Sequence, residues 1–180
     1  SSCTGVASAA QGSGVPINEI TTRIGVIKAY STRVGGGPFP TEMPDYPAKK
    51  IRELGYEYGT VTGRPRRIGW FDDVYFKEMA RAYGLTGIAI TRLDILDDLP
   101  IIGVGVEGKS GAGEFEWMPG WKTWSGSAGK GFIGESVRGC KTWDSLPQAA
   151  KDYCLRIACG VPIKYISVGP AREETIVISQ

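Results

Sequence analysis

The chain carries the stretch Tyr58-Gly-Thr-Val-Thr-Gly-Arg-Pro-Arg-Arg-Ile-Gly-Trp-Phe-Asp72, which places three arginines within four positions. The arginines are Arg64, Arg66 and Arg67, and the hydroxyls of Thr60 and Thr62 precede them. No apolar periodicity runs through the stretch, so we predict a loop and neither a core strand nor an amphipathic helix. Arginine binds a carboxylate or a phosphate through two parallel hydrogen bonds. The residue types therefore fit a loop that binds an anionic ligand, and they fit a solvated basic loop equally well.

Composition limits the class of protein. The 180 residues are 42% hydrophobic and 22% charged, which is typical of a globular domain with its own core. The formal net charge of +2 is too small to indicate a general nucleic-acid surface. No apolar run is long enough for a transmembrane helix, so we expect neither a membrane nor a nucleic acid as a partner.

Histidine is absent from the sequence, and this excludes a Ser-His-Asp triad, a histidine general base and a histidine-ligated metal within this chain. The cysteines Cys3, Cys140, Cys154 and Cys159 form no CxxC pair, so we expect free thiols in a reducing, cytoplasmic environment. The sequence opens with Ser1-Ser-Cys-Thr-Gly5 and no methionine, and we expect it to be a piece of a longer polypeptide.

The order of the predicted elements indicates an α/β fold, because strands alternate with helices. The predicted strands cover residues 24–30, 87–94, 100–106, 164–168 and 175–178. The predicted helices cover residues 47–54, 73–83 and 146–158. Asp72 is expected to cap the second helix and Gly84 to end it.

The remaining segments are expected to be irregular. We predict a surface loop over residues 1–18, although a phosphate-cradling turn with a short helix is compatible with the same small residues. Residues 31–42 contain three glycines and Pro-Phe-Pro, and they predict a long loop directly after a strand. Residues 107–130 predict no regular element. Their tryptophans are expected to pack in the core or under a lid, and they are Trp117, Trp121 and Trp124.

Asp94 is expected at the carboxyl end of the strand 87–94, the edge at which α/β sheets bind ligands. Its carboxylate can accept two hydrogen bonds from adjacent N–H donors, such as those on the edge of guanine. A helix-capping role explains an aspartate at this place at least as well.

Taken together, several motifs resemble the adenylosuccinate synthetase family, and they occur in the family's order over nearly the whole chain. The motifs are Lys28-Ala-Tyr-Ser-Thr-Arg-Val-Gly-Gly-Gly-Pro-Phe-Pro-Thr-Glu42, Thr62-Gly-Arg-Pro-Arg-Arg-Ile-Gly-Trp-Phe-Asp72, Thr91-Arg-Leu-Asp94, Leu146-Pro-Gln-Ala-Ala150, Gly160-Val-Pro-Ile163 and Ser167-Val-Gly-Pro170.

This resemblance implies that residues 1–180 are the C-terminal portion of one P-loop-NTPase-like domain, with a mixed sheet, helices and long ligand-binding loops. It implies a homodimeric, cytoplasmic ligase of purine biosynthesis that joins L-aspartate to the 6-position of IMP. The family phosphorylates the 6-oxygen with GTP and Mg²⁺, and the aspartate amine then displaces phosphate. The catalytic residues and the Mg²⁺ ligands are expected in an N-terminal part, so we expect neither in this chain.

The resemblance also implies residues of the binding site. Aspartate and IMP are expected to contact Val34, Thr60, Val61, Thr62, Gly63, Arg64, Pro65 and Arg66. The purine nucleoside triphosphate, GTP or ATP, is expected to contact Arg66, Arg92, Leu93, Asp94, Ser167, Val168, Gly169 and Pro170.

Three residues depart from the family pattern. Arg92 replaces the usual lysine, Val61 stands where a threonine is common, and Ala171 replaces an aspartate. Compact phage enzymes of this kind act on dGMP with ATP or dATP, and that reaction is the alternative function. A nucleotide-binding or dimerisation fragment without turnover is the alternative from another class.

Overall fold

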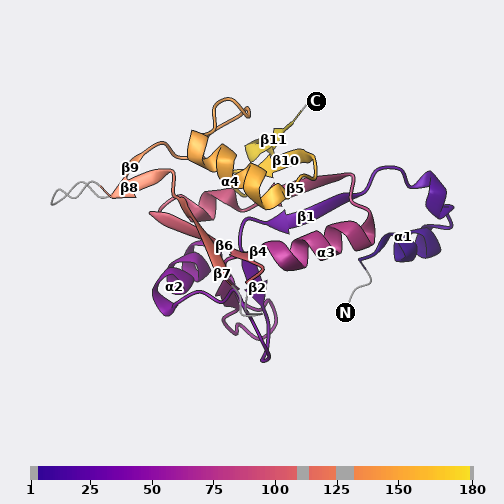
Figure 1. The fold of residues 1–180 in the computed structure, drawn as a ribbon, viewed down its shortest axis with the longest axis horizontal. Helices are drawn as coiled ribbons and strands as arrows, with labels where there is room; N and C mark the ends of the chain where they lie inside the picture. Colours follow the sequence, from indigo (N-terminus) through magenta and orange to yellow (C-terminus); the bar gives the residue numbers. More distant parts are fainter. Residues whose placement is uncertain (1–3, 109–113, 125–131, 179–180) are drawn as a thin grey trace.

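The computed structural model describes residues 4–108, 114–124 and 132–178, and they form a mixed α/β fold (Figure 1). The helices are α1 (Val6–Ser13), α2 (Asp45–Leu54), α3 (Asp73–Tyr83) and α4 (Gln148–Ala158), with 3-10 turns η1 (Ile17–Glu19), η2 (Leu93–Leu96) and η3 (Arg172–Glu174). The strands are β1 (Ile24–Lys28), β2 (Ser31–Arg33), β3 (Arg67–Gly69), β4 (Phe71–Asp72), β5 (Gly87–Thr91), β6 (Ile101–Val106), β7 (Glu114–Pro119), β8 (Lys122–Trp124), β9 (Phe132–Gly134), β10 (Ile163–Ser167) and β11 (Thr175–Val177).

The central sheet has the strand order β1-β5-β10-β11. Its first three strands run parallel, and β11 joins antiparallel to β10. Lys28 lies opposite Thr91, and Ile90 lies opposite Ile166, so the three parallel strands end at the same edge. Three smaller sheets, β4-β6-β7, β2-β3 and β8-β9, complete the strand pairing. The predicted α/β class with a mixed sheet is confirmed.

The core lies between this sheet and the helices that cover it. Ile88, Ile90 and Ile166 are fully buried in the central strands. Burying one such side chain stabilises the fold by roughly 1.5–3 kcal/mol. Tyr153 of α4 is also fully buried, and its hydroxyl donates a hydrogen bond of 2.5 Å to the carbonyl of Ala29. Helix α4 is thereby fixed against the segment that follows β1.

Helix α3 forms as the sequence predicts. The Asp72 side chain accepts a hydrogen bond of 3.0 Å from the amide of Tyr75, which satisfies one of the free N–H groups at the helix start. Gly84 ends the helix in the left-handed conformation with a φ of 56°, where a side chain would be strained. The apolar face packs inward through the buried ring of Phe76.

The predicted loop 58–72 is shorter than expected, because its last part forms β3 and β4. Ile68, Trp70 and Phe71 are buried in the core. The alternation of polar and apolar residues begins only after Arg66. The two short strands were missed because the whole stretch was interpreted as one loop.

Three other predicted loops contain regular structure. Residues 1–18 include the helix α1. None of the residues of this helix is fully buried. Ser31–Arg33 form β2, because their backbone pairs with β3. Residues 107–130 include β7, which pairs with β6, and β8. Of these, β2 depends on a partner that is distant in the sequence.

The tryptophans differ in how far they are buried. Trp121 is buried, and its indole N–H donates a hydrogen bond of 2.6 Å to Asp97. Trp117 is about half exposed and packs edge-on against Trp70 at 5.6 Å between ring centroids. The side chain of Trp124 lies outside the described residues. Core packing is therefore confirmed for Trp121.

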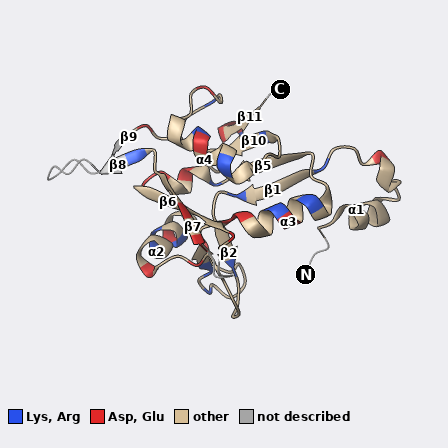
Figure 2. Cartoon of the chain, viewed as in Figure 1, with Lys and Arg blue, Asp and Glu red and all other residues tan. Residues whose placement is uncertain are grey.

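Cys140, Cys154 and Cys159 are free thiols in the structure, as predicted, and Cys3 lies outside the described residues. Acidic and basic side chains are interspersed over the molecule (Figure 2). Within the described ranges, every helix is too short or too polar to cross a membrane.

Candidate functional site

A pocket opens where the parallel strands end. The last residues of these strands are Lys28, Thr91 and Ser167. Open α/β sheets bind their ligands at this carboxyl edge. The pocket has a volume of about 550 Å³. Its lining residues are Leu54, Tyr56, Thr91, Arg92, Asp94, Ile95, Arg138, Ser167, Gly169 and Pro170.

Arg92 enters this pocket directly after β5. Its backbone is left-handed, with a φ of 63°, an uncommon conformation for a residue that has a side chain. The guanidinium Nη1 donates a hydrogen bond of 2.5 Å to the carbonyl of Gly55. The side chain is therefore held in place at the pocket wall before any ligand arrives.

Asp94 places a carboxylate in the same pocket from the 3-10 turn η2. The residue is buried, and its Oδ2 lies 3.2 Å from the Nη2 of Arg138. Burial raises the pKa of Asp94, and the positive charge of Arg138 acts in the opposite direction. A desolvated carboxylate of this kind binds N–H donors strongly, because few waters compete for it.

The end of β10 and the loop after it line the pocket through Ser167, Gly169 and Pro170. Ser167 donates a hydrogen bond of 2.8 Å from its Oγ to the carbonyl of Gly169. A Cβ at Gly169 would collide with the carboxyl group of Glu174, so a larger residue there would displace that side chain. Glu174 in turn accepts a hydrogen bond of 2.8 Å from the amide of Ala171, which braces the loop.

Two of the residues that were expected to contact the nucleotide have side chains that face the core and not the pocket. The side chains of Leu93 and Val168 are fully buried in the hydrophobic core. Only their backbone atoms are left for a ligand. Five other residues expected there line the same pocket, and they are Arg92, Asp94, Ser167, Gly169 and Pro170. Arg66, which was also expected at the nucleotide, does not line this pocket.

The arginine loop, residues 58–66, is a hairpin that projects from the body of the protein. The amide of Gly59 donates to the carbonyl of Arg64, and the amide of Gly63 donates to the carbonyl of Gly59, each at 2.8 Å. Gly63 takes a φ of 62°, which favours glycine. Val61 at the tip is 96% exposed. All six expected binding residues of the tip are exposed, and they are Thr60, Val61, Thr62, Gly63, Arg64 and Pro65.

The three arginines of this region differ in their partners. Among the described residues, the guanidinium of Arg64 has no hydrogen-bond or ion-pair partner, so it is open to a ligand. Arg66 donates from Nη1 to Glu57 at 2.7 Å. Arg67 forms a two-pronged ion pair with Glu42, with distances of 2.7 and 2.5 Å.

Arg67 connects the arginine loop to the glycine-rich loop 34–42. Its Nη1 also donates a hydrogen bond of 2.8 Å to the carbonyl of Gly37, and its guanidinium lies 5.4 Å from the centre of the Phe39 ring. Glu42 holds the pKa of Arg67 above its usual value through this hydrogen-bonded pair. The third arginine is therefore a structural link, although residue type alone placed all three in one anion-binding cluster.

Val34 follows β2 and is 77% exposed, outside the pocket lining. Arg33, the last residue of β2, pairs with Arg67, the first residue of β3. Val34 is consequently carried by the same small sheet as the arginine loop.

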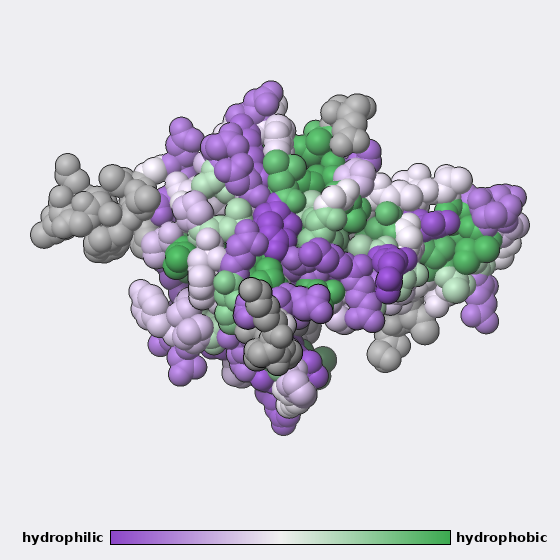
Figure 3. Space-filling view, in the orientation of Figure 1, coloured by the Kyte–Doolittle hydropathy of each residue, from purple (hydrophilic) through white to green (hydrophobic). Residues whose placement is uncertain are grey.

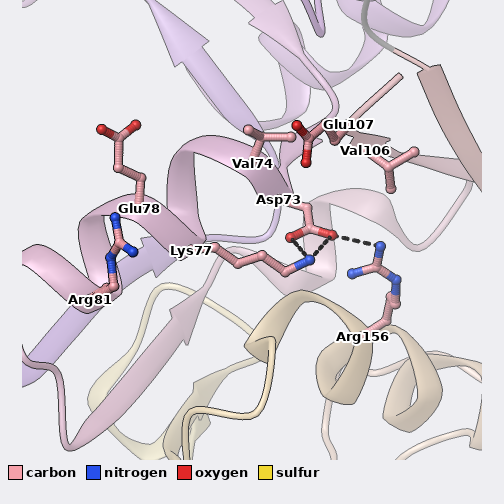
Figure 4. Close-up of a pocket in the computed structure, with 8 residues that line it drawn as sticks. All are labelled: Asp73, Val74, Lys77, Glu78, Arg81, Val106, Glu107 and Arg156. Atoms are coloured by element: carbon pink, nitrogen blue, oxygen red, sulfur yellow. Dashed lines mark hydrogen bonds and ion pairs between the residues drawn. The ribbon is translucent and has the colours of Figure 1, made fainter. Parts of the chain in front are cut away.

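A second cavity, of about 500 Å³, lies between α3, β6 and α4 (Figure 4). Asp73 lies at its wall, and its carboxylate binds Lys77 at 2.8 Å and Arg156 at 2.7 Å. Burial favours a higher pKa for Asp73, but hydrogen bonds from Lys77, Arg156 and the Cys159 thiol outweigh it and lower the pKa. These charges already satisfy one another, so the cluster joins α3 to α4.

The structure adds residues that the sequence interpretation missed. Arg138 reaches Asp94 across 44 positions of sequence, and Glu57 binds both Arg66 and Lys28. No motif marks these partners, because each contact joins distant segments. Within the described ranges, no group of three or more histidine, cysteine, aspartate or glutamate side chains is arranged to hold a metal ion.

These features define an α/β protein with a pocket of charged and apolar residues at the carboxyl edge of its parallel strands and a neighbouring arginine loop. The chain belongs to the adenylosuccinate synthetase family, whose sequence model matches residues 1–176. It is 40% identical to the adenylosuccinate synthetase of Magnetococcus marinus over 197 residues, which cover 99% of this chain and 43% of that protein. The enzyme of Geobacter sulfurreducens matches at 40% over 198 residues, with the same coverage.

Solved structures give the same result for the fold. A fully ligated adenylosuccinate synthetase from Plasmodium falciparum superposes with a TM-score of 0.85 at 33% identity, covering 99% of this chain and 45% of that one. The succinoaminodeoxyadenylate synthetase of cyanophage S-2L, solved with dGMP and dATP, superposes with a TM-score of 0.55 at 17% identity and covers 96% and 38%. The chain thus spans less than half the length of the relatives that it matches.

Proposed function

We propose that this chain supplies the C-terminal portion of an adenylosuccinate synthetase, a ligase that joins L-aspartate to the 6-position of IMP with GTP and Mg²⁺. The observation that carries the proposal is the pocket in which Arg92, the buried Asp94 and the loop 167–170 meet at one sheet edge. The membership of the chain in the family supplies the reaction.

Within this proposal the pocket binds the base of the nucleoside triphosphate. The Asp94 carboxylate accepts the two N–H donors at the edge of guanine, a preference that adenine does not meet. Arg92 stacks on the purine face, since a planar guanidinium packs well on an aromatic ring. Main-chain groups of Ser167 and Gly169 close over the base, Pro170 abuts it, and the buried Leu93 and Val168 contribute backbone only.

The arginine loop binds L-aspartate. The guanidinium of Arg64, which no described side chain occupies, binds one substrate carboxylate and the ribose of IMP, and the exposed hydroxyls of Thr60 and Thr62 add further donors. Arg66 lies between the aspartate and the nucleotide phosphates. The backbone of Val34 contacts the IMP sugar.

The remaining parts of the proposed enzyme come from outside this chain. The phosphoryl-transfer step needs Mg²⁺ and catalytic groups, whereas the part of the chain that the structure describes offers no metal-binding cluster. The residues of this chain bind and orient the aspartate and the purine nucleotides. The proposed enzyme is a cytoplasmic homodimer.

The test is a turnover assay of the full-length gene product with L-aspartate and Mg²⁺. Formation of the succinyl-purine is followed by ultraviolet absorbance with IMP or dGMP as acceptor and GTP or ATP as donor. Turnover of IMP with GTP is the expected result. Turnover of dGMP with ATP alone identifies the phage-type reaction, and no turnover with any pair leaves a binding fragment; either outcome overturns the proposal.

A further inference from the structure

Glu57 is a buried carboxylate at the base of the arginine loop, and only 1% of its side chain is exposed. Its Oε1 accepts hydrogen bonds from Lys28 at 2.7 Å and from the Tyr30 hydroxyl at 2.8 Å. Its Oε2 accepts one from Arg66 at 2.7 Å. Lys28 and Tyr30 belong to one stretch at the end of β1, and Arg66 comes from the segment just before β3. One carboxylate therefore joins its own turn to two other stretches of the chain.

The charges of this cluster do not cancel. Lys28 and Arg66 carry two positive charges and Glu57 carries one negative charge, which leaves one net positive charge. About 30% of the Lys28 side chain and 29% of the Arg66 side chain are exposed, whereas the carboxylate between them is not. The solvent-facing side of the cluster is consequently cationic. Lys28 also donates a hydrogen bond of 3.3 Å to the Thr32 hydroxyl, so one of its three N–H donors is left for a ligand, and Arg66 keeps donors that Glu57 does not use.

The cluster also lies between the two parts of the candidate site. Lys28 is opposite Thr91, which lines the pocket, and the carbonyl of Gly55 holds Arg92. On the other side, the Glu57 carbonyl accepts a hydrogen bond of 2.9 Å from the amide of Arg66. The turn 55–57 thus contacts the pocket through Gly55 and the arginine loop through Glu57.

We propose that Lys28 is a further anion-binding residue of this site, acting beside Arg66, and that Glu57 is the positioning residue that presets both cations. Two cations held on opposite oxygens of one buried carboxylate do not have to be ordered when the ligand binds. The anion is a carboxylate or a phosphate, because both accept several charge-assisted hydrogen bonds. Its identity, L-aspartate or the nucleotide phosphate, rests on the proposed function.

The variants have matched controls within the chain. Lys28→Gln removes the proposed ligand-binding cation, and Lys28→Arg keeps the charge. Lys122→Gln is the control, because Lys122 is also a partly buried lysine paired with carboxylates, Asp97 and Asp98, outside the site. Glu57→Gln removes the positioning charge, and Asp73→Asn removes an equally buried carboxylate with two cationic partners (Figure 4).

Binding of L-aspartate, of IMP and of inorganic phosphate to the full-length protein is measured by isothermal titration calorimetry, and turnover is measured in parallel. We expect Lys28→Gln to weaken binding of at least one of these anions by about tenfold, the scale of one charge-assisted contact. Lys28→Arg should restore most of the loss, and Lys122→Gln should stay within about twofold of wild type. The anion that loses affinity identifies the bound group.

The positioning role of Glu57 has its own readout. In nitrogen-15 NMR spectra, the Arg66 guanidinium should show slow rotation in wild type and in Asp73→Asn, and fast rotation in Glu57→Gln. Glu57→Gln should raise KM for the affected substrate more than it lowers kcat.

Three results overturn the inference: anion affinities of Lys28→Gln within about twofold of wild type, no anion binding by the wild-type protein, or unchanged Arg66 rotation in Glu57→Gln. Loss of anion binding in Lys28→Gln together with a wild-type protein that forms no succinyl-purine contradicts the proposed function alone.

Discussion

At the scale of single residues, the partners of each arginine determine what it can do. Arg64, Arg66 and Arg67 are close in sequence, yet Arg67 is occupied by Glu42 and Arg66 is held by Glu57, whereas no described side chain occupies Arg64. A sequence motif gives the residue types but cannot distinguish these states, because the acidic partners lie elsewhere in the chain.

Replacement of Arg64 by alanine tests the proposed aspartate contact. Loss of one charge-assisted hydrogen bond is expected to cost about 1.5–3 kcal/mol, which lowers kcat/KM for L-aspartate by roughly 10- to 150-fold. Steady-state kinetics of the full-length variant measure this loss. Arg81→Ala, an exposed arginine of α3, serves as the control, and a kcat/KM for Arg64→Ala equal to that of this control contradicts the assignment.

Replacement of Arg92 by lysine tests how the base is recognised. A guanidinium stacked on a purine contributes about 0.5–2 kcal/mol, so the ratio of GTP to ATP use is expected to change by roughly 2- to 30-fold. The ratio of the two kcat/KM values is the measurement. If the ratio stays unchanged, the purine is read by other groups, with Asp94 as the first to examine.

At the scale of elements, sequence patterns were most predictive where the signals were local. Helix α3 begins after Asp72 and ends before Gly84, as the capping residues indicate. The strands β5 and β10 were found from their apolar runs, and their ends brought Asp94 and Ser167 to one edge. Strand β2 was missed, because its pairing with β3 depends on a partner more than thirty positions away.

The Asp72 cap gives a prediction for this element. Asp72→Ala should lower the free energy of unfolding by about 1 kcal/mol, because the amide of Tyr75 loses its acceptor. Urea denaturation followed by circular dichroism measures the change. Glu78→Ala, on the exposed surface of the same helix, should have an effect smaller than about 0.5 kcal/mol. Equal effects of the two variants would show that the cap does not stabilise α3.

The candidate site was predictable only in part, for the same reason. The pocket residues Arg92, Asp94 and Gly169 belong to short motifs at strand ends, where chemistry and position coincide. Glu57 is one acidic residue between two tyrosines and carries no pattern of its own. Its contact with Lys28 spans 29 positions, so only the folded chain reveals it.

At the scale of the whole molecule, the apolar surface is unevenly distributed. Figure 3 shows one group of hydrophobic residues around α1. A groove of about 560 Å³ lies in this region, lined by residues of α1, β1 and α3. β1 is the edge strand of the central sheet, and its Val26 is exposed. The pocket at the carboxyl edge of the parallel strands and this apolar groove share no lining residue.

Acid stability of the fold depends on its buried carboxylates. Burial raises the pKa of Glu57, but the hydrogen bonds from Lys28, Tyr30 and Arg66 outweigh it, so its pKa lies below the ordinary value of 4.5. A carboxyl with a lowered pKa contributes stability above its unfolded pKa and loses it as the pH falls through the folded pKa. Unfolding by urea should therefore show wild type well above Glu57→Gln near neutral pH, with the difference shrinking below about pH 4.5. A difference that stays constant with pH would contradict this.

The most direct test of the proposed ligase reaction follows the 6-oxygen of the purine. The full-length protein is incubated with L-aspartate, GTP, Mg²⁺ and IMP that carries oxygen-18 at the 6-position, and the released phosphate is analysed by mass spectrometry. We predict one labelled phosphate for each succinyl-purine formed, because the 6-oxygen leaves as phosphate when the aspartate amine takes its place. Unlabelled phosphate, or phosphate released without a succinyl-purine, would contradict the proposed reaction.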